Sequence, residues 1–128
     1  KFFEILDLGF GRCRFALAAK KGTDFFTGYK AKTIASKYPN VSRQYFESRG
    51  MDVRIIKIEG SVELAPLVGL ADGIVDIVET GSTLKENGLA VLEEVCPVSC
   101  RMIVNQVSMQ MKTRRIREIM ANVRDCLE

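Results

Sequence analysis

The sequence contains no histidine and no tryptophan, and only three of its 128 residues are proline. Histidine is the commonest general base, and no other pattern marks an activated serine or cysteine nucleophile. No uninterrupted apolar run reaches the roughly 20 residues that a membrane-spanning helix needs. These absences argue against a membrane protein and favour a chemistry that needs no covalent intermediate.

Four cysteines are present, namely Cys13, Cys96, Cys100 and Cys126. Cys96 and Cys100 are separated by three residues, which does not match the paired knuckles of zinc sites, and no histidine can complete a mixed site. We therefore expect free thiols in a reducing cytoplasm and no protein-bound metal.

Hydrophobic residues make up 47% of the chain, charged residues 27%, and the formal net charge is +3. These values are ordinary for a globular domain, and the length suits one compact domain plus pieces of a neighbour. The chain starts at Lys1, and sequence with the pattern of secondary structure follows almost at once. It lacks the basic and apolar segments of a secretion leader. We expect a fragment of a longer, cytoplasmic protein.

The first half predicts a βαβ unit. Cys13 to Ala19 is a predicted strand, and a short strand at Thr33–Ser36 precedes a helix that starts at Pro39-Asn40, with Asn40 as its cap. This helix ends at Gly50, and the β-branched run from Val53 to Ile58 predicts the next strand. The strands before and after the helix should be parallel.

A second unit follows. Ser61 is the predicted cap of a short helix over Val62 to Val68, with Pro66 about one turn in. The apolar run from Ile74 to Val78 predicts a central strand that is covered on both faces. A helical turn ending at Asn87-Gly88 and strands over Leu89 to Val95 and Arg101 to Gln106 complete the predicted order.

The C-terminal segment has the apolar spacing of an amphipathic helix, carried by Ile116, Ile119, Met120, Val123 and Leu127. Basic residues crowd its first turns: Lys112, Arg114, Arg115 and Arg117. No aromatic residues interleave with them, as binding of single-stranded nucleic acid would favour, so we expect a solvated face and no nucleic-acid partner.

The stretch from Asp76 to Leu84 carries the candidate chemistry. Ligands of open α/β sheets bind beyond the carboxyl ends of the strands, where this loop is predicted to lie. Gly81 allows close approach of the backbone, and Thr80, Ser82 and Thr83 add hydroxyl donors beside backbone amides that attract phosphate. Asp76 and Glu79 would repel a bare phosphate but suit a ligand that also carries hydroxyl groups or Mg²⁺. A plain turn with a helix cap would produce the same Thr-Gly-Ser-Thr sequence, so both interpretations stay open on chemistry alone.

Longer motifs resemble the ATP phosphoribosyltransferase family. The central one comprises Glu59-Gly60-Ser61-Val62-Glu63-Leu64-Ala65-Pro66, then Gly69-Leu70-Ala71-Asp72, then Asp76-Ile77-Val78-Glu79-Thr80-Gly81-Ser82-Thr83-Leu84-Lys85-Glu86-Asn87. The flanks Asp7-Leu8-Gly9-Phe10-Gly11, Cys13-Arg14-Phe15, Ser36-Lys37-Tyr38-Pro39-Asn40-Val41, Tyr45-Phe46, Val104-Asn105 and Ser108 are similar too. The resemblance thus covers nearly the whole chain, as the C-terminal portion of the enzyme in its short form.

This resemblance implies an α/β fold of the two-lobed type II periplasmic-binding-protein kind, with one complete lobe (a mixed sheet flanked by helices) and part of the other. Residues 1–19 and 100–128 would be parts of the split first lobe, including two hinge strands, and residues 20–99 the second lobe. Residues 79–84 would bind the 5′-phosphate of phosphoribosyl pyrophosphate, and Asp76 and Glu79 the ribose hydroxyls. Ser61 and Glu63 are possible additional site members.

The implied reaction joins N1 of ATP to C1 of phosphoribosyl pyrophosphate, with Mg²⁺ held mainly by the substrate, as the first step of L-histidine biosynthesis. We expect the fragment alone to be inactive because part of the ATP pocket is absent. The resemblance also implies a homo-oligomer and, for the short form, a separate histidine-sensing regulatory subunit. The alternatives are a non-catalytic small-anion-binding module of the same architecture and an unrelated phosphoribosyltransferase, whose acidic residues would usually be adjacent.

Overall fold

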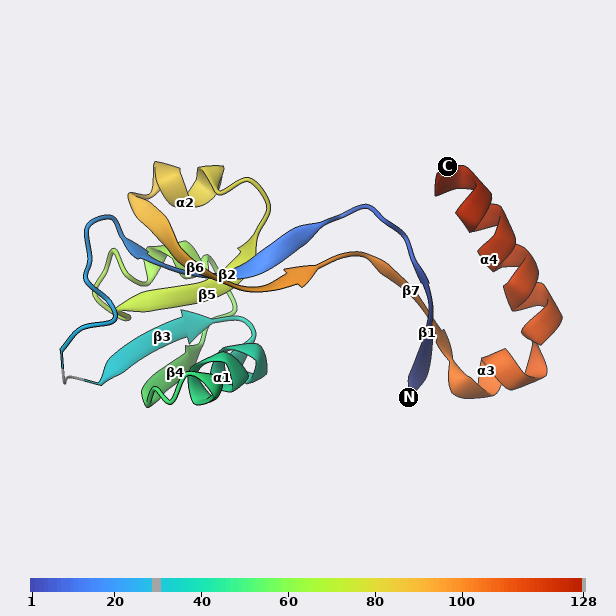
Figure 1. Ribbon diagram of the computed structural model, residues 1–128, viewed down its shortest axis with the longest axis horizontal. Helices are drawn as coiled ribbons and strands as arrows, with labels where there is room; N and C mark the ends of the chain where they lie inside the picture. Colours follow the sequence, from blue (N-terminus) through green and yellow to red (C-terminus); the bar gives the residue numbers. More distant parts are fainter. Residues whose placement is uncertain (29–30, 128) are drawn as a thin grey trace. The chain divides into compact units, whose positions relative to one another are not determined.

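The computed structural model describes residues 1–28 and 31–127. The chain divides into two compact units: one comprises Lys1–Arg12 and Val98–Glu128, and the other Cys13–Pro97. The larger unit holds a five-stranded sheet in the order β4-β3-β5-β2-β6 (Figure 1). Its strands are β2 (Cys13–Lys20), β3 (Lys32–Ser36), β4 (Val53–Lys57), β5 (Gly73–Val78) and β6 (Leu89–Val98). Its helices are α1 (Pro39–Ser48), the 3-10 helix η1 (Val62–Leu64) and α2 (Ser82–Glu86).

The sheet is mixed, as expected from the sequence. β3 is parallel to both β4 and β5, and β2 is antiparallel to β5. The β3-α1-β4 segment is therefore the predicted βαβ unit. β5 occupies the middle of the sheet; Ile74, Val75 and Val78 are buried, but Ile77 at its end is exposed, so the prediction of complete cover on both faces was wrong there.

Two apolar clusters cover the two faces of this sheet. One contains Ala35, Ile74 and Val78 from the strands with Val62 of η1 and Leu84 of α2. The other contains Leu17, Ile34 and Val75 with Phe46 of α1. The alternation of residues along each strand separates the two sets, since neighbours in a strand point to opposite faces. We call the first the η1 face and the second the α1 face; Figure 1 shows α1 and α2 on opposite sides of the strands.

Helix α1 begins at Pro39, within the predicted start, but its cap is a different residue from the one predicted. Its N-cap is Tyr38, and Asn40 lies inside the first turn, where its amide oxygen accepts a hydrogen bond from Arg43 at 3.2 Å. Pro39 fits the first helical position because its missing N–H would have no partner there. The predicted cap at Asn40 was therefore wrong, whereas Gly50 adopts a left-handed φ of 68° just past the helix end, as predicted.

The helix after Ser61 is also shorter than predicted. Only Val62–Leu64 forms a 3-10 helix, and Ser61 precedes it without a side-chain capping bond. Pro66 has no N–H and so cannot donate to the Val62 carbonyl four residues back. The Ala65 amide donates a hydrogen bond to that carbonyl instead, at 3.0 Å. The chain then continues in turns through Gly69, whose φ is 78°.

The smaller unit contains two elements that the sequence patterns did not reveal. These are β1 (Phe2–Asp7), which pairs antiparallel with β7 (Arg101–Asn105), and α3 (Gln106–Met111). Arg101 forms ion pairs with Glu4 and Asp7. The predicted C-terminal helix is α4 (Thr113–Leu127), and its Ile116 is buried. The basic residues at its start are exposed, as expected, and Arg115 lies 3.6 Å from Glu118.

Ser36 links β3 to β5 inside the larger unit. Its buried hydroxyl donates to the Val75 carbonyl at 2.6 Å and accepts from the Tyr38 amide at 3.0 Å. We expect Ser36→Ala to lower the free energy of unfolding by about 1–3 kcal/mol, because the Val75 carbonyl loses a buried hydrogen bond and the Tyr38 amide loses a partly buried one. Chemical denaturation of the intact protein measures this. The exposed Ser48→Ala, which also removes a hydroxyl-to-carbonyl bond, should cost less than about 0.5 kcal/mol; equal losses would contradict the prediction.

Candidate functional site

The candidate loop lies at the carboxyl edge of the sheet. Because β4, β3 and β5 are parallel, the residues that follow Lys57, Ser36 and Val78 lie at one edge. The antiparallel β2 brings its beginning to the same edge, since Arg14 lies opposite Val78. This edge therefore gathers three strand-to-helix loops and the start of a fourth strand, which is the usual place for a ligand in open α/β sheets.

The loop from Glu79 to Gly81 connects β5 to α2. Gly81 is the N-cap residue of α2 and has a φ of 82°, a conformation that other residues adopt only with strain. Glu79, Thr80, Ser82 and Thr83 are exposed. Leu84 is buried in the cluster of the η1 face, so only its backbone can face a ligand. The loop is thus open to solvent, and the buried side chain of Leu84 anchors the start of α2 in the core.

The loop amides differ in their availability. The Ser82 amide donates to the Thr80 hydroxyl oxygen at 3.3 Å, and the two hydroxyl oxygens lie 3.0 Å apart. The Lys85 amide donates to the Gly81 carbonyl at 3.0 Å and so begins the helical bonding. Within residues 1–28 and 31–127, the Thr83 and Leu84 amides have no hydrogen-bond acceptor. These two amides can bind an anion without breaking a bond. Of the Thr80 and Ser82 hydroxyls, one donates to the other, and only the second keeps a free O–H for a ligand.

Asp76 lies half-buried on β5, on the η1 face. Its carboxylate accepts a hydrogen bond from the Ile77 amide at 2.9 Å. Burial is the main cause that raises the pKa of Asp76, and the negative charge of Glu63 adds to it; the Ile77 hydrogen bond and the positive charge of Lys37 act in the opposite direction. A carboxylate in this position can accept hydrogen bonds from ligand hydroxyls, but burial and Glu63 make its charged form harder to maintain.

The structure places the other predicted site residues as follows. Glu63 on η1 is partly buried and close enough to Asp76 to act on its charge. Ser61 is exposed at the start of η1, and its hydroxyl makes no capping bond. Glu79 is exposed at the end of β5. All three follow parallel strands and so share the carboxyl edge with Asp76.

Two charged residues at this edge had no predicted role, Lys37 and Arg14. Lys37 follows β3 directly and acts on Asp76 through its charge. Arg14 lies on β2 opposite Val78, two residues from Ala16, which is opposite Asp76. Their placement depends on strand pairing between distant segments. The sequence showed only that Lys37 directly follows one predicted strand and that Arg14 is the second residue of another.

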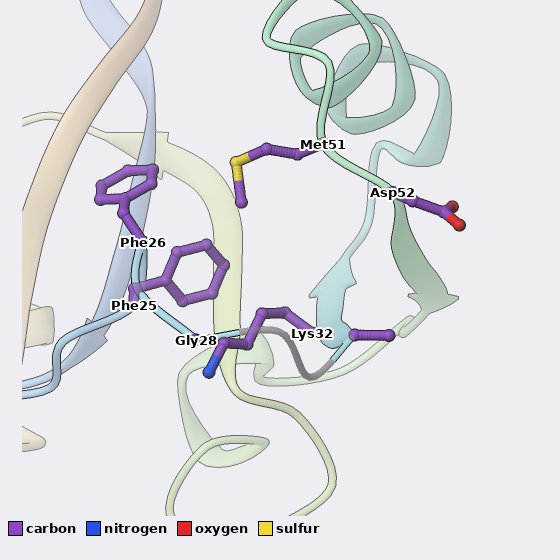
Figure 2. A pocket seen from close by; sticks show the side chains of 7 residues that line it. Phe25, Phe26, Gly28, Lys32, Met51 and Asp52 are labelled. Carbon is purple, nitrogen blue, oxygen red and sulfur yellow. The ribbon is translucent and has the colours of Figure 1, made fainter.

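A pocket of about 380 Å³ lies at the other edge of the sheet and is separate from this loop. Figure 2 shows Phe25, Phe26 and Met51 around it, while Asp52 points away from the two rings. Lys32 is the first residue of β3 and Asp52 precedes β4, so this pocket is at the amino ends of the parallel strands. The candidate site is therefore the exposed loop and not this pocket.

The described part of the chain contains no group of three or more histidine, cysteine or carboxylate residues that could hold a metal ion. The four cysteines are free thiols. None of the described helices is both long and apolar enough to cross a membrane.

The model of the family "HisG: ATP phosphoribosyltransferase" matches residues 1–125. The chain belongs to the ATP phosphoribosyltransferase family. Curated relatives named ATP phosphoribosyltransferase from Clostridium kluyveri and Clostridium botulinum are 62% and 58% identical to it and are matched over 95% and 99% of this chain. The matched regions cover 56% and 60% of those relatives, so the chain spans little more than half of their length.

Solved structures agree with the family and the fold. The ATP phosphoribosyl transferase (HisG:HisZ) complex from Thermotoga maritima has a chain with a TM-score of 0.88 and 38% identity, covering 99% of this chain and 62% of that one. Holo ArgBP from T. maritima has a TM-score of 0.61 at 15% identity, covering 98% of this chain and 56% of that one. The latter shares only the fold, and it confirms the predicted periplasmic-binding-protein-like α/β architecture.

Proposed function

We propose that the intact protein joins N1 of the adenine of ATP to C1 of phosphoribosyl pyrophosphate and releases pyrophosphate, the first step of L-histidine biosynthesis. Membership of the family supports the reaction class. The observation that carries the site assignment is the exposed loop at the carboxyl edge, where Gly81 is left-handed and the Thr83 and Leu84 amides have no acceptor in the described chain. We assign the 5′-phosphate to this loop and the ribose hydroxyls to Asp76 and Glu79.

The proposed mechanism depends on positioning and charge. When the bond from C1 to pyrophosphate lengthens, positive charge builds at C1 and negative charge on the leaving group. Asp76 and Glu79 would hold the ribose hydroxyls and lie near the developing positive charge, while the loop amides fix the phosphate end of the sugar. Mg²⁺, which we place on the substrate pyrophosphate, would supply neutralisation of the leaving group. No covalent intermediate with the protein is required.

Further assignments belong to the same proposal. Residues 1–19 and 100–128 would be parts of one lobe and its hinge strands, and residues 20–99 the lobe that carries the loop. The solved relative from Thermotoga maritima is a HisG:HisZ complex, which supports a separate regulatory subunit and a multi-subunit assembly for this protein as well. A biosynthetic role with nucleotide and sugar-phosphate substrates supports a cytoplasmic location. Ser61 and Glu63 would line the same site.

We expect Thr83→Val in the intact protein to raise the KM for phosphoribosyl pyrophosphate about tenfold, because a hydroxyl donor to a charged phosphate is lost. The KM for ATP should change less than about twofold. Steady-state kinetics with each substrate varied in turn measures both. The matched control is Thr23→Val, an exposed threonine after β2 at the other edge of the sheet, which should change neither constant.

Equal effects of Thr83→Val on both substrates would remove the assignment of the loop to the phosphoribosyl group. Tight binding of phosphoribosyl pyrophosphate by the intact protein, with no product formed in the presence of ATP and Mg²⁺, would favour the anion-binding module instead.

A further inference from the structure

The pocket at the amino ends of the parallel strands has a wall of large apolar side chains. It measures about 380 Å³, a volume in the range of sites that hold small molecules. Phe25 in this wall is 2% exposed and belongs to the core cluster of the α1 face. Phe26 and Met51 complete the wall, and Figure 2 shows the Met51 thioether turned toward the two rings. These three side chains offer a surface on which a flat apolar group can pack.

Contacts outside the pocket hold this wall in place. The rings of Phe25 and Phe26 meet edge to face with their centroids 5.4 Å apart, and the Phe25 centroid lies 6.3 Å from that of Phe46. The Arg49 guanidinium lies 5.0 Å from the centroid of the Phe26 ring and forms an ion pair with Glu93. Phe26 is 43% exposed, but these contacts fix the position of its ring. Because the rings are ordered by their protein neighbours, a ligand loses less free energy in ordering them.

The charge that reaches into the pocket is positive. Lys32, the first residue of β3, is partly buried, and Figure 2 shows its side chain extending past the Phe25 ring toward Gly28. Asp52 also lines the pocket, but it points away from the two rings. Neither Lys32 nor Asp52 has an ion-pair partner within residues 1–28 and 31–127. The Lys32 ammonium group is therefore available to an anionic ligand.

We propose that this pocket binds a small organic anion with a flat apolar body, such as an aromatic carboxylate. The carboxylate pairs with Lys32, and the ring packs against Phe25, Phe26 and Met51. Inorganic phosphate lacks the apolar part and a neutral ring lacks the charge, so a ligand needs both to use the whole pocket.

This site is separate from the proposed phosphoribosyl site. Lys32 begins β3, whereas the proposed phosphate loop follows the end of β5, and these two strands are parallel. The pocket and the loop thus lie at opposite edges of the sheet. The inference goes beyond the proposed function and does not depend on it.

The test uses 3-phenylpropanoate as the probe and the terminal methyl group of Met51 as the reporter. In the intact protein with ¹³C-methyl-labelled methionine, the Met51 resonance is assigned by its loss in Met51→Leu. We expect this resonance to shift saturably with a Kd of the order of 1 mM, because the probe is small. The neutral 3-phenylpropanamide should bind about three- to fivefold more weakly, since it loses one partly exposed ion pair. Acetate, which has no ring, should leave the resonance in place at the same concentrations.

Variants of Lys32 test the source of the charge selectivity. Lys32→Met should weaken binding of 3-phenylpropanoate about three- to fivefold and leave binding of the amide unchanged, since only the carboxylate pairs with Lys32. Lys32→Arg should keep the wild-type affinity within about twofold. Lys20→Met is the matched control. Lys20 is exposed at the end of the antiparallel β2, hence at the same edge of the sheet, but it does not line the pocket, so its loss should leave the affinity unchanged.

Three results would overturn the inference. An unmoved Met51 resonance at about 20 mM probe, well above the expected Kd, would exclude the pocket as the site. Equal affinities for the carboxylate and the amide would show that the pocket does not select anions. Equal losses in Lys32→Met and Lys20→Met would show a general attraction of anions to this edge of the sheet. None of these measurements requires ATP or phosphoribosyl pyrophosphate, so they are independent of the outcome for the proposed function.

Discussion

Gly81→Val in the intact protein is expected to raise the KM for phosphoribosyl pyrophosphate about 30- to 100-fold and to leave the KM for ATP within about threefold. The φ of 82° at Gly81 is strained for a β-branched residue by about 1–3 kcal/mol, so the loop must leave this conformation. A Cβ at this position would meet only Val78 Cγ1 at 3.9 Å, so the effect comes from the backbone and not from a clash. Relocation of the Thr83 and Leu84 amides would then remove the proposed contacts with the phosphate.

Gly88→Val separates this effect from general strain. Gly88 lies just past the other end of α2 and has a φ of 71°, and a Cβ at this position would meet nothing within 4 Å. Both variants should lose stability by similar amounts, measured by chemical denaturation, but only Gly81→Val should change the KM for phosphoribosyl pyrophosphate. Two results would exclude the loop as the phosphate site. One is the same KM for phosphoribosyl pyrophosphate in both variants, and the other is an equal rise in the KM for ATP in Gly81→Val.

The sequence predicted the elements whose signals are local. Runs of β-branched and apolar residues marked β3, β4 and β5, and the intervening helix gave the parallel βαβ unit. Glycines at helix ends were equally informative: Gly50 and Gly88 both adopt the left-handed conformation that stops a helix. These features depend on a few consecutive residues and on backbone sterics, which the sequence shows directly.

The missed elements depend on distant partners or on short segments. β1 shows little alternation of buried and exposed residues, and it is a strand because β7, nearly one hundred residues later, pairs with it. α3 has only six residues, too few for an apolar periodicity. The start of α3 could have been predicted from Asn105. Its side-chain oxygen accepts hydrogen bonds from the Val107 and Ser108 amides, as expected of an asparagine at a helix N-cap.

The site shows the same division. The loop from Glu79 to Leu84 was predicted in place because its strand, glycine and helix are contiguous. The effect of the Lys37 charge on the pKa of Asp76 could not be predicted, because it depends on the pairing of β3, which Lys37 follows, with β5 about forty residues later in the chain. The internal bond between Thr80 and Ser82 was also missed, since hydroxyl residues in a turn can bind each other as readily as a ligand.

Phe46→Ala is expected to lower the free energy of unfolding by about 3–5 kcal/mol. Phe46 is 1% exposed and is one of the largest fully buried side chains, packed with Leu17, Ile34 and Val75 on the α1 face. Its ring lies 5.0 Å from that of Tyr45 and 6.3 Å from that of Phe25. The substitution removes the side chain that fixes α1 to the sheet and leaves a cavity that these rigid neighbours fill only in part.

Phe10→Ala makes the same chemical change at a side chain that is 53% exposed, and it should cost less than about 0.5 kcal/mol. The α1 face lies opposite the face that carries Asp76 and Leu84, so the folded fraction of Phe46→Ala should keep the wild-type KM for phosphoribosyl pyrophosphate. Chemical denaturation and kinetics corrected for the folded fraction measure the two effects. A loss no larger than that of Phe10→Ala would contradict the packing role, and a raised KM would show that the two faces of the sheet are coupled.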